Sequence, residues 1–153
     1  MTEGESFAPL FYYCVKLLYS SKLIMYNVNK YQWRGVIPLT GAGFEKVSLG
    51  CLPPIACSCG MTRRAFADSP DSPASVHLLY VSKDAKTHWH EKFTEIYTVL
   101  EGEGGLELDG ELVHVKPLDS VMIKPGTRHR AVGRLTVLNV AVPRFDPTDE
   151  HYE

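Results

Sequence analysis

The chain of 153 residues has the length of a single domain and is long enough to bury a hydrophobic core. Its 16 Lys and Arg residues against 18 Asp and Glu residues give a formal charge of −2. Proteins that bind nucleic acid or an anionic membrane surface typically carry an excess of basic residues. The chain has no such excess, so we expect neither partner. The four cysteines form no evenly spaced disulfide framework, which favours a reducing compartment, so we expect a cytoplasmic protein.

The first 50 residues mix aromatic and polar side chains and are expected to form an N-terminal arm and outer strands. The apolar stretch 7–19 is interrupted by Lys16, is too short to span a bilayer and follows an acidic start, unlike a signal peptide. Residues 1–24 are either a short extra strand or arm, or an extension ahead of a natural start at Met25. Because their aromatic side chains would be costly to expose as one patch, we expect them to pack on the rest of the chain or on a second subunit, and we expect a homodimer.

The main domain is expected over residues 51–145, with its most regular part at 75–142, and residues 146–153 are expected to form a polar C-terminal tail. The segment 68–73 is rich in Ser, Pro and Asp and predicts an exposed loop. Strands are predicted at 76–81, 95–100, 106–108, 112–115, 121–123 and 135–142.

Turn residues separate these strands. The Gly-rich segment 101–105 is predicted to end the second strand, and Pro125-Gly126 predicts another turn. Asp109-Gly110 between two alternating runs predicts a two-residue hairpin, because both turn positions require a positive φ. Many short strands, without an amphipathic helix of ten residues over 75–142, indicate an all-β sandwich or barrel.

Four residues form a candidate metal site. His88 and His90 are two positions apart, so on a strand both imidazoles point to the same side, and Glu95 follows in the next predicted strand. His129 follows the Pro125-Gly126 turn, which can aim a side chain back into the mouth of a barrel. Three imidazoles and one carboxylate suit one divalent Fe, Mn, Ni, Co or Zn ion with positions left open for water or substrate.

Residues 88–102 also resemble the first motif of the cupin superfamily, His-x-His-x4-Glu-x6-Gly, through His88, His90, Glu95 and Gly102. Residues 124–129 resemble the second motif through Gly126 and His129. The resemblance implies an all-β fold, a cupin-type double-stranded β-helix (jelly-roll-like) barrel of two antiparallel sheets, and the four residues as metal ligands. The chain departs from the motifs at three positions that are not ligands: Ser82, Lys124 and Gly133.

Other residues have two interpretations each. Tyr97, two positions after Glu95 on the same face, either acts as a catalytic proton donor and orients substrate, or fills the barrel. Arg63 and Arg64 either hold an anionic substrate group or are solvated charges. Cys57 and Cys59 are more typical of small buried side chains than of a second metal or redox pair.

Two classes of function follow for this site. The first is a small-molecule metalloenzyme, dioxygenase-like or sugar-isomerase-like, that is, a metal-dependent oxidoreductase or isomerase. The alternative is a non-enzymatic cupin that binds or senses a small ligand, with a structural or ligand-anchoring metal. For the enzyme, the cupin resemblance implies several chemistries, which include dioxygenation, decarboxylation and sugar isomerisation, and the fold and the metal do not choose among these. The sequence contains no helix-turn-helix pattern and no basic patch, which argues against a nucleic-acid partner.

Overall fold

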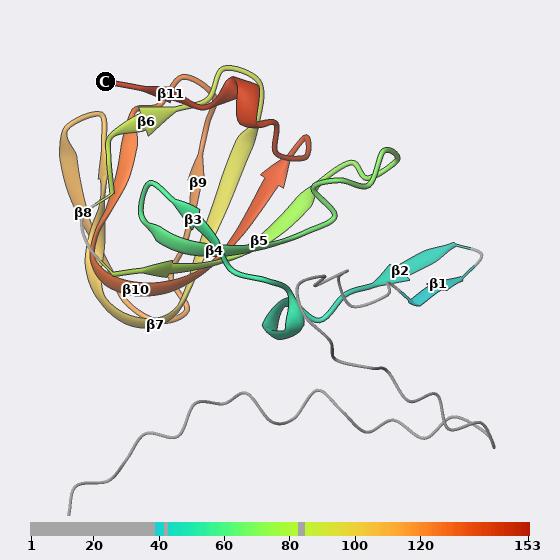
Figure 1. Cartoon of the computed structure of the whole chain (residues 1–153). Coiled ribbons are helices and arrows are strands. Elements are labelled where there is room, and N and C mark those ends of the chain that lie inside the picture. The colour runs from blue at the N-terminus through green and yellow to red at the C-terminus, as the bar shows by residue number, and fades with distance from the viewer. Residues whose placement is uncertain (1–38, 42, 83–84) are drawn as a thin grey trace, which may run out of the picture. The chain divides into compact units, whose positions relative to one another are not determined.

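The computed structural model describes residues 39–41, 43–82 and 85–153, which form antiparallel strands and two short 3-10 helices (Figure 1). The questions about residues 1–24 and about their packing on a second subunit lie outside the described residues, so the homodimer stays a prediction. The elements are β1 (Leu39–Gly41), β2 (Phe44–Lys46), η1 (Leu49–Cys51), β3 (Ile55–Cys57), β4 (Gly60–Ala65), β5 (Ser75–Val81), β6 (His88–Trp89), β7 (Thr94–Leu108), β8 (Glu111–Val115), β9 (Ser120–Ile123), β10 (His129–Val142), η2 (Pro147–Asp149) and β11 (His151–Tyr152).

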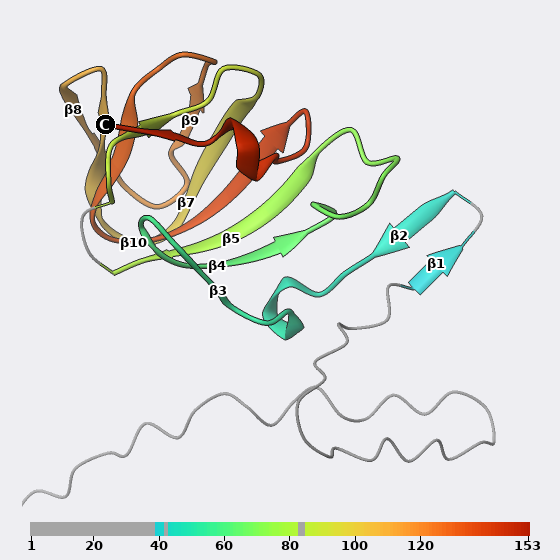
Figure 2. The ribbon, with the colours of Figure 1, turned by 45° about the horizontal axis from the view of Figure 1, so that its top comes forward.

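Two long strands, β7 and β10, pair with each other along almost their whole length (Figures 1 and 2). Both strands curl around the barrel, so that each belongs to both of its sheets. The second half of β10 and the first half of β7 lie between β5 and β9, and β4 and β3 continue that sheet. The first half of β10 and the second half of β7 lie between β6 and β8, and β11 adds to β6. The predicted all-β jelly-roll barrel is therefore confirmed.

The glycine-rich segment 101–105 does not end a strand as predicted, because β7 runs through it. The pairing register with β10 shifts here, so that Leu100 is an extra residue in β7. Gly102 has a φ of 99°, and a Cβ at this position would overlap the carbonyl oxygen of Arg134. The glycines therefore permit the bend and the close approach of β10 that let one strand serve both sheets.

Alternation along the strands separates a buried interior from an outer face. In β7, Glu95, Tyr97 and Val99 are buried while the residues between them are more exposed, as the sequence pattern predicts. The largest hydrophobic cluster, which includes Val99, Leu106 and Val137, fills the barrel between the two sheets. Burying such apolar surface contributes about 25 cal/mol per Å² and is the main term that holds the barrel closed.

The local predictions are confirmed at two turns. Asp109 and Gly110 have φ values of 48° and 87°, and Leu108 pairs with Glu111 across them, as expected for a two-residue hairpin. Pro125-Gly126 forms the turn before β10. Among the described residues, no helix is long and apolar enough to cross a lipid bilayer.

Candidate metal centre

The structure brings the four residues of the candidate metal site together inside the barrel. His88 lies in β6, His90 follows that strand directly, Glu95 begins the inward face of β7, and His129 begins β10 opposite His88. All four are buried, with at most 6% of each residue exposed. One ligand atom from each lies within 4.8 Å of those from the others, which is close enough for a single ion.

A backbone carbonyl orients each imidazole through its Nδ1 atom. The distances are 3.0 Å from His88 to the Lys86 oxygen, 2.8 Å from His90 to the Asp149 oxygen and 2.9 Å from His129 to the Thr127 oxygen. Because a carbonyl only accepts, each Nδ1 carries the proton and donates it. In the neutral ring, the Nε2 atom then has a free lone pair, which is the state in which histidine binds a metal.

Glu95 lies between two of these rings. Its Oε2 atom is 3.3 Å from the Nε2 atom of His90 and 3.0 Å from that of His129, and its Oε1 atom accepts a hydrogen bond of 2.6 Å from the Asn139 amide. Burial by itself would raise the pKa of Glu95, but the neighbouring imidazoles of His129 and His90 outweigh it and hold that pKa well below its usual range. The carboxylate is therefore ionised at neutral pH.

These contacts fit a bound divalent cation. The Oε2 atom of Glu95 and the Nε2 atom of His129 are buried, and within the described part of the chain neither has a hydrogen-bond partner of good geometry. Two atoms with lone pairs that face each other at 3.0 Å need a proton or a metal ion between them. Burial lowers the pKa of His88 to about 4, so its ring is neutral and suited to a metal.

Comparison with known proteins agrees with this geometry. A family model described as a cupin domain matches residues 76–137. The crystal structure of a protein from Planctomyces limnophilus is 37% identical, with 72% of this chain and 98% of that chain covered and a TM-score of 0.69. The chain belongs to the cupin superfamily. No curated protein matches it.

Two other solved cupin-fold structures are more distant. Pac13 of Streptomyces, a nucleoside dehydratase, is 19% identical, with 71% of this chain and 89% of that chain covered and a TM-score of 0.62. The ectoine synthase from P. lautus is 18% identical, with 60% and 70% covered and a TM-score of 0.52. At these identities the likeness shows the fold alone.

The C-terminal residues, which were expected to form a polar tail, complete the surroundings of His90. The buried carboxylate of Asp149 accepts hydrogen bonds from the backbone amides of Glu91 and Lys92, at 3.1 Å and 2.9 Å. The Phe93 ring stacks on His90, with the ring centres 4.0 Å apart. Asp149 is 59 residues from His90, and its local pattern does not distinguish it from any exposed aspartate, so the sequence did not point to it.

Tyr97 lies inside the cupin barrel, with its ring centre 6.2 Å from that of His129. The strand register places it beside Asn139 of β10, which in turn pairs with His77 of β5 and through it with Arg64 of β4. This row of polar residues crosses the inner face of the sheet next to the metal site. Burial, together with the charge of Glu95, raises the pKa of Tyr97 well above its usual value, so the phenol keeps its proton.

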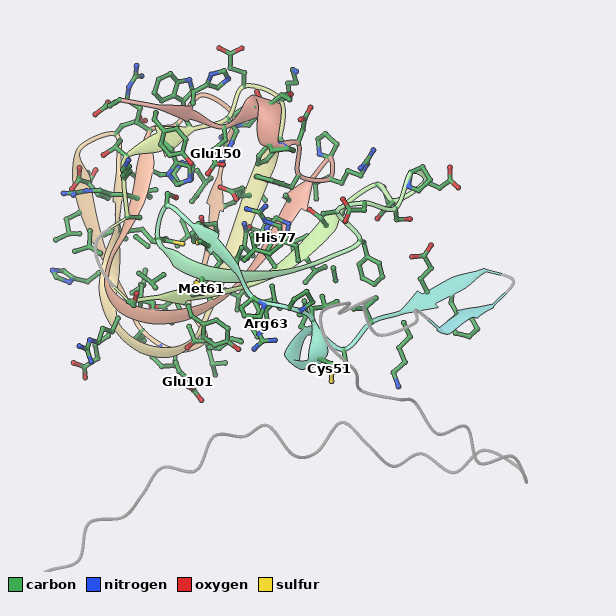
Figure 3. All side chains as sticks on the ribbon, viewed as in Figure 1. Cys51, Met61, Arg63, His77, Glu101 and Glu150 are labelled. Carbon is green, nitrogen blue, oxygen red and sulfur yellow. The ribbon has the colours of Figure 1, made fainter. Side chains whose placement is uncertain are left out.

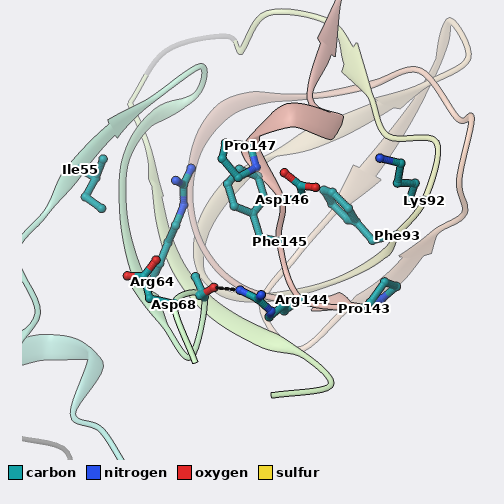
Figure 4. A pocket seen from close by; sticks show the side chains of 11 residues that line it. Ile55, Arg64, Asp68, Lys92, Phe93, Pro143, Arg144, Phe145, Asp146 and Pro147 are labelled. Atoms are coloured by element: carbon teal, nitrogen blue, oxygen red, sulfur yellow. Dashed lines mark hydrogen bonds between the residues drawn. The ribbon is translucent and has the colours of Figure 1, made fainter. Parts of the chain in front are cut away.

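The two arginines lie on opposite faces of β4. Arg63 donates hydrogen bonds to the carbonyl oxygens of Gly50 and Leu52, beside η1 (Figure 3). Arg64 stacks over the Phe145 ring at 4.1 Å and lines a cleft of about 590 Å³ (Figure 4). Phe93 also lines this cleft and stacks on His90, so one side chain contacts both the cleft and the candidate metal site.

Proposed function

We propose that His88, His90, Glu95 and His129 hold one divalent metal ion, and that the protein is a metal-dependent enzyme that acts on a small molecule, as a dioxygenase-like oxidoreductase or a sugar-isomerase-like enzyme. The observation that supports this most is the orientation of the three imidazoles. Each donates its Nδ1 proton to a carbonyl, so that all three Nε2 atoms are available to a cation beside an ionised carboxylate. Fe, Mn, Ni, Co and Zn all suit this ligand set.

A metal bound here would act as a Lewis acid on a carbonyl or as a binding site for O2. The residues of the chain prepare the site for this chemistry. Asn139 fixes one oxygen of Glu95, which leaves the other free for the ion. Tyr97, protonated and inside the barrel, would donate a hydrogen bond or a proton to a small molecule beside the ligands. The apolar cluster around it excludes water.

A second candidate is a cupin that binds a small ligand without transforming it. The burial of all four ligand residues favours this candidate, because a closed site is typical of structural metals. The two candidates differ in whether the small molecule is chemically changed. Both require the metal, so a test of metal binding must come first.

The first experiment is elemental analysis of protein purified without an affinity tag or chelator, beside a His88→Ala/His90→Ala variant. We expect a nearly stoichiometric divalent metal in the wild type and none in the variant. The absence of metal from the wild type, also after anaerobic reconstitution with each of the five ions, would refute the metal site.

The second experiment incubates the metal-loaded protein with a mixture of cellular small molecules and follows the mixture by mass spectrometry. An enzyme depletes one compound and forms another, and the double variant does neither. A compound that is retained in a stoichiometric amount but unchanged would refute the enzyme and support the binding protein.

A further inference from the structure

The tight turn between β3 and β4 carries two cysteine side chains in direct contact. Cys57 ends β3 and pairs with Gly60 of β4, and Ser58 and Cys59 form the turn between them. The Sγ atoms of Cys57 and Cys59 are 2.9 Å apart, and both thiols are free. A disulfide bond has an S–S length of about 2.05 Å, so the two sulfurs would need to approach each other by only about 0.9 Å.

The two thiols differ in exposure and in chemical character. Cys57 is half-buried and can be reached from solvent, whereas Cys59 is 7% exposed and belongs to the same hydrophobic cluster as Tyr97. The hydrogen bond from Cys59 lowers the pKa of Cys57 to about 6 and, together with burial, raises the pKa of Cys59. Cys57 is therefore suited to be the attacking thiolate, and Cys59 the thiol that resolves its adduct.

We propose that Cys57 and Cys59 form a reversible dithiol–disulfide site, oxidised by a small disulfide such as oxidised glutathione. The Cys57 thiolate attacks one sulfur of the small disulfide, forms a mixed disulfide and releases one thiolate. Cys59 loses its proton to solvent and attacks the Cys57 sulfur, which forms the Cys57–Cys59 bond and releases the second thiolate. Two electrons pass from the protein to the small disulfide, which leaves as two thiols after protonation.

The position of the turn connects this site to the barrel interior. Burial raises the pKa of Tyr152 of β11 to about 12 and the Ser58 side chain acts in the opposite direction, so Ser58 lies near the Tyr152 hydroxyl. The Tyr152 ring centre is 6.0 Å from that of His88. Tyr152 also pairs with His88 in the ladder between β11 and β6. Ser58, the residue between the two cysteines, is therefore a neighbour of Tyr152, whose ring packs against His88 of the candidate metal centre. Oxidation of the thiol pair does not itself require a metal.

The test uses the full chain in glutathione buffers of increasing oxidised-to-reduced ratio, followed by acid quenching, alkylation and peptide mass spectrometry. Fragmentation before Pro53 separates Cys51 from the pair. We expect the fragment that carries Cys57 and Cys59 to carry two alkyl groups in reducing buffer, to lose both as the buffer becomes more oxidising and the disulfide forms, and to regain both when dithiothreitol is added before alkylation. A wild-type fragment that keeps both thiols at every ratio would overturn the proposal.

Two variants with small side chains test the assigned roles. Cys59→Ala is expected to stop at a glutathione adduct on Cys57, and Cys57→Ala is expected to leave Cys59 unmodified, because that thiol is buried. A glutathione adduct on Cys59, or an adduct on Cys57 that persists in the wild type, would contradict the roles. The pH at which iodoacetamide alkylates Cys57 gives a second measurement, since its midpoint is expected to rise when Cys59 is replaced.

Discussion

The carboxylate of Asp149 offers the sharpest test of how the C-terminal segment supports the candidate metal centre. Its two oxygens accept hydrogen bonds from the backbone amides of Glu91 and Lys92, the two residues that follow His90. The backbone oxygen of Asp149 accepts a hydrogen bond from Nδ1 of His90. Burial acts to raise the pKa of Asp149, but these amide donors and His151 lower it overall, so the group is an anion at neutral pH. Asp149→Ala removes this anchor and leaves the backbone carbonyl in place but unsupported.

The structure sets the size of the expected effect. A hydrogen bond to a charged group contributes roughly 1.5–3 kcal/mol, and the substitution leaves two amides without their acceptor. Allowing for water that replaces part of this loss, we expect Asp149→Ala to lower the free energy of unfolding by about 3 kcal/mol. Outer residues that orient a metal-binding histidine affect affinity by roughly tenfold to a hundredfold, and we expect a loss in that range.

The assay pairs urea unfolding with competition for metal against a chromophoric chelator. Asp119→Ala is the matched control, because Asp119 also accepts a backbone amide, that of Lys116, but in a turn that bonds to Val99 and not to a ligand. The control should lose stability without losing metal affinity in the folded protein. Equal affinity of the two variants for a metal that the wild type binds would refute the role of Asp149 in positioning His90.

Three further predictions follow from the same structure. Glu95→Gln removes the buried negative charge and should lower metal content at least tenfold by elemental analysis with an unchanged circular dichroism spectrum; full metal content would contradict the assignment. Burial, with the nearby Arg64 charge, lowers the pKa of His77 to about 4, whereas the unfolded chain binds this proton near pH 6.5. The free energy of unfolding should therefore fall by on the order of 3 kcal/mol as pH falls from 6.5 to 4. In urea unfolding, His77→Gln should show a smaller fall over that range than the wild type. Gly102→Ala should lower the free energy of unfolding by more than about 2 kcal/mol, because the added Cβ would overlap the Arg134 carbonyl. Gly50→Ala is the control and should change this free energy by less than about 0.5 kcal/mol, because open space surrounds Gly50. Similar values for both variants would contradict the close approach at Gly102.

The parts of the fold that were predicted correctly depend on local rules. The Asp109-Gly110 hairpin follows from the need for positive φ at two adjacent residues, and the inward face of β7 follows from alternation. The spacing of His88, His90 and Glu95 likewise reports which side chains share a face. These features are encoded within a few residues, which is why a single sequence reveals them.

The parts that were missed depend on pairing between distant strands. Gly102 was taken as the end of a strand because a glycine-rich run breaks most strands, and only the register with β10 shows it to be a bend. Asn139 and Asp149 were not identified as site residues. Asn139 is a polar residue in an otherwise apolar strand, and Asp149 belongs to an acidic segment. Their partners Glu95 and His90 are 44 and 59 residues away.

The long separation between His90 and Asp149 also sets an order of events during synthesis of the chain. The first motif leaves the ribosome well before β10 supplies His129, and before β11 covers the open edge of β6. Until then β6 has an unpaired edge, which is available to wrong partners. His129 is the last of the four candidate ligand residues along the chain, so the site is assembled only when β10 has paired with β6 and β7.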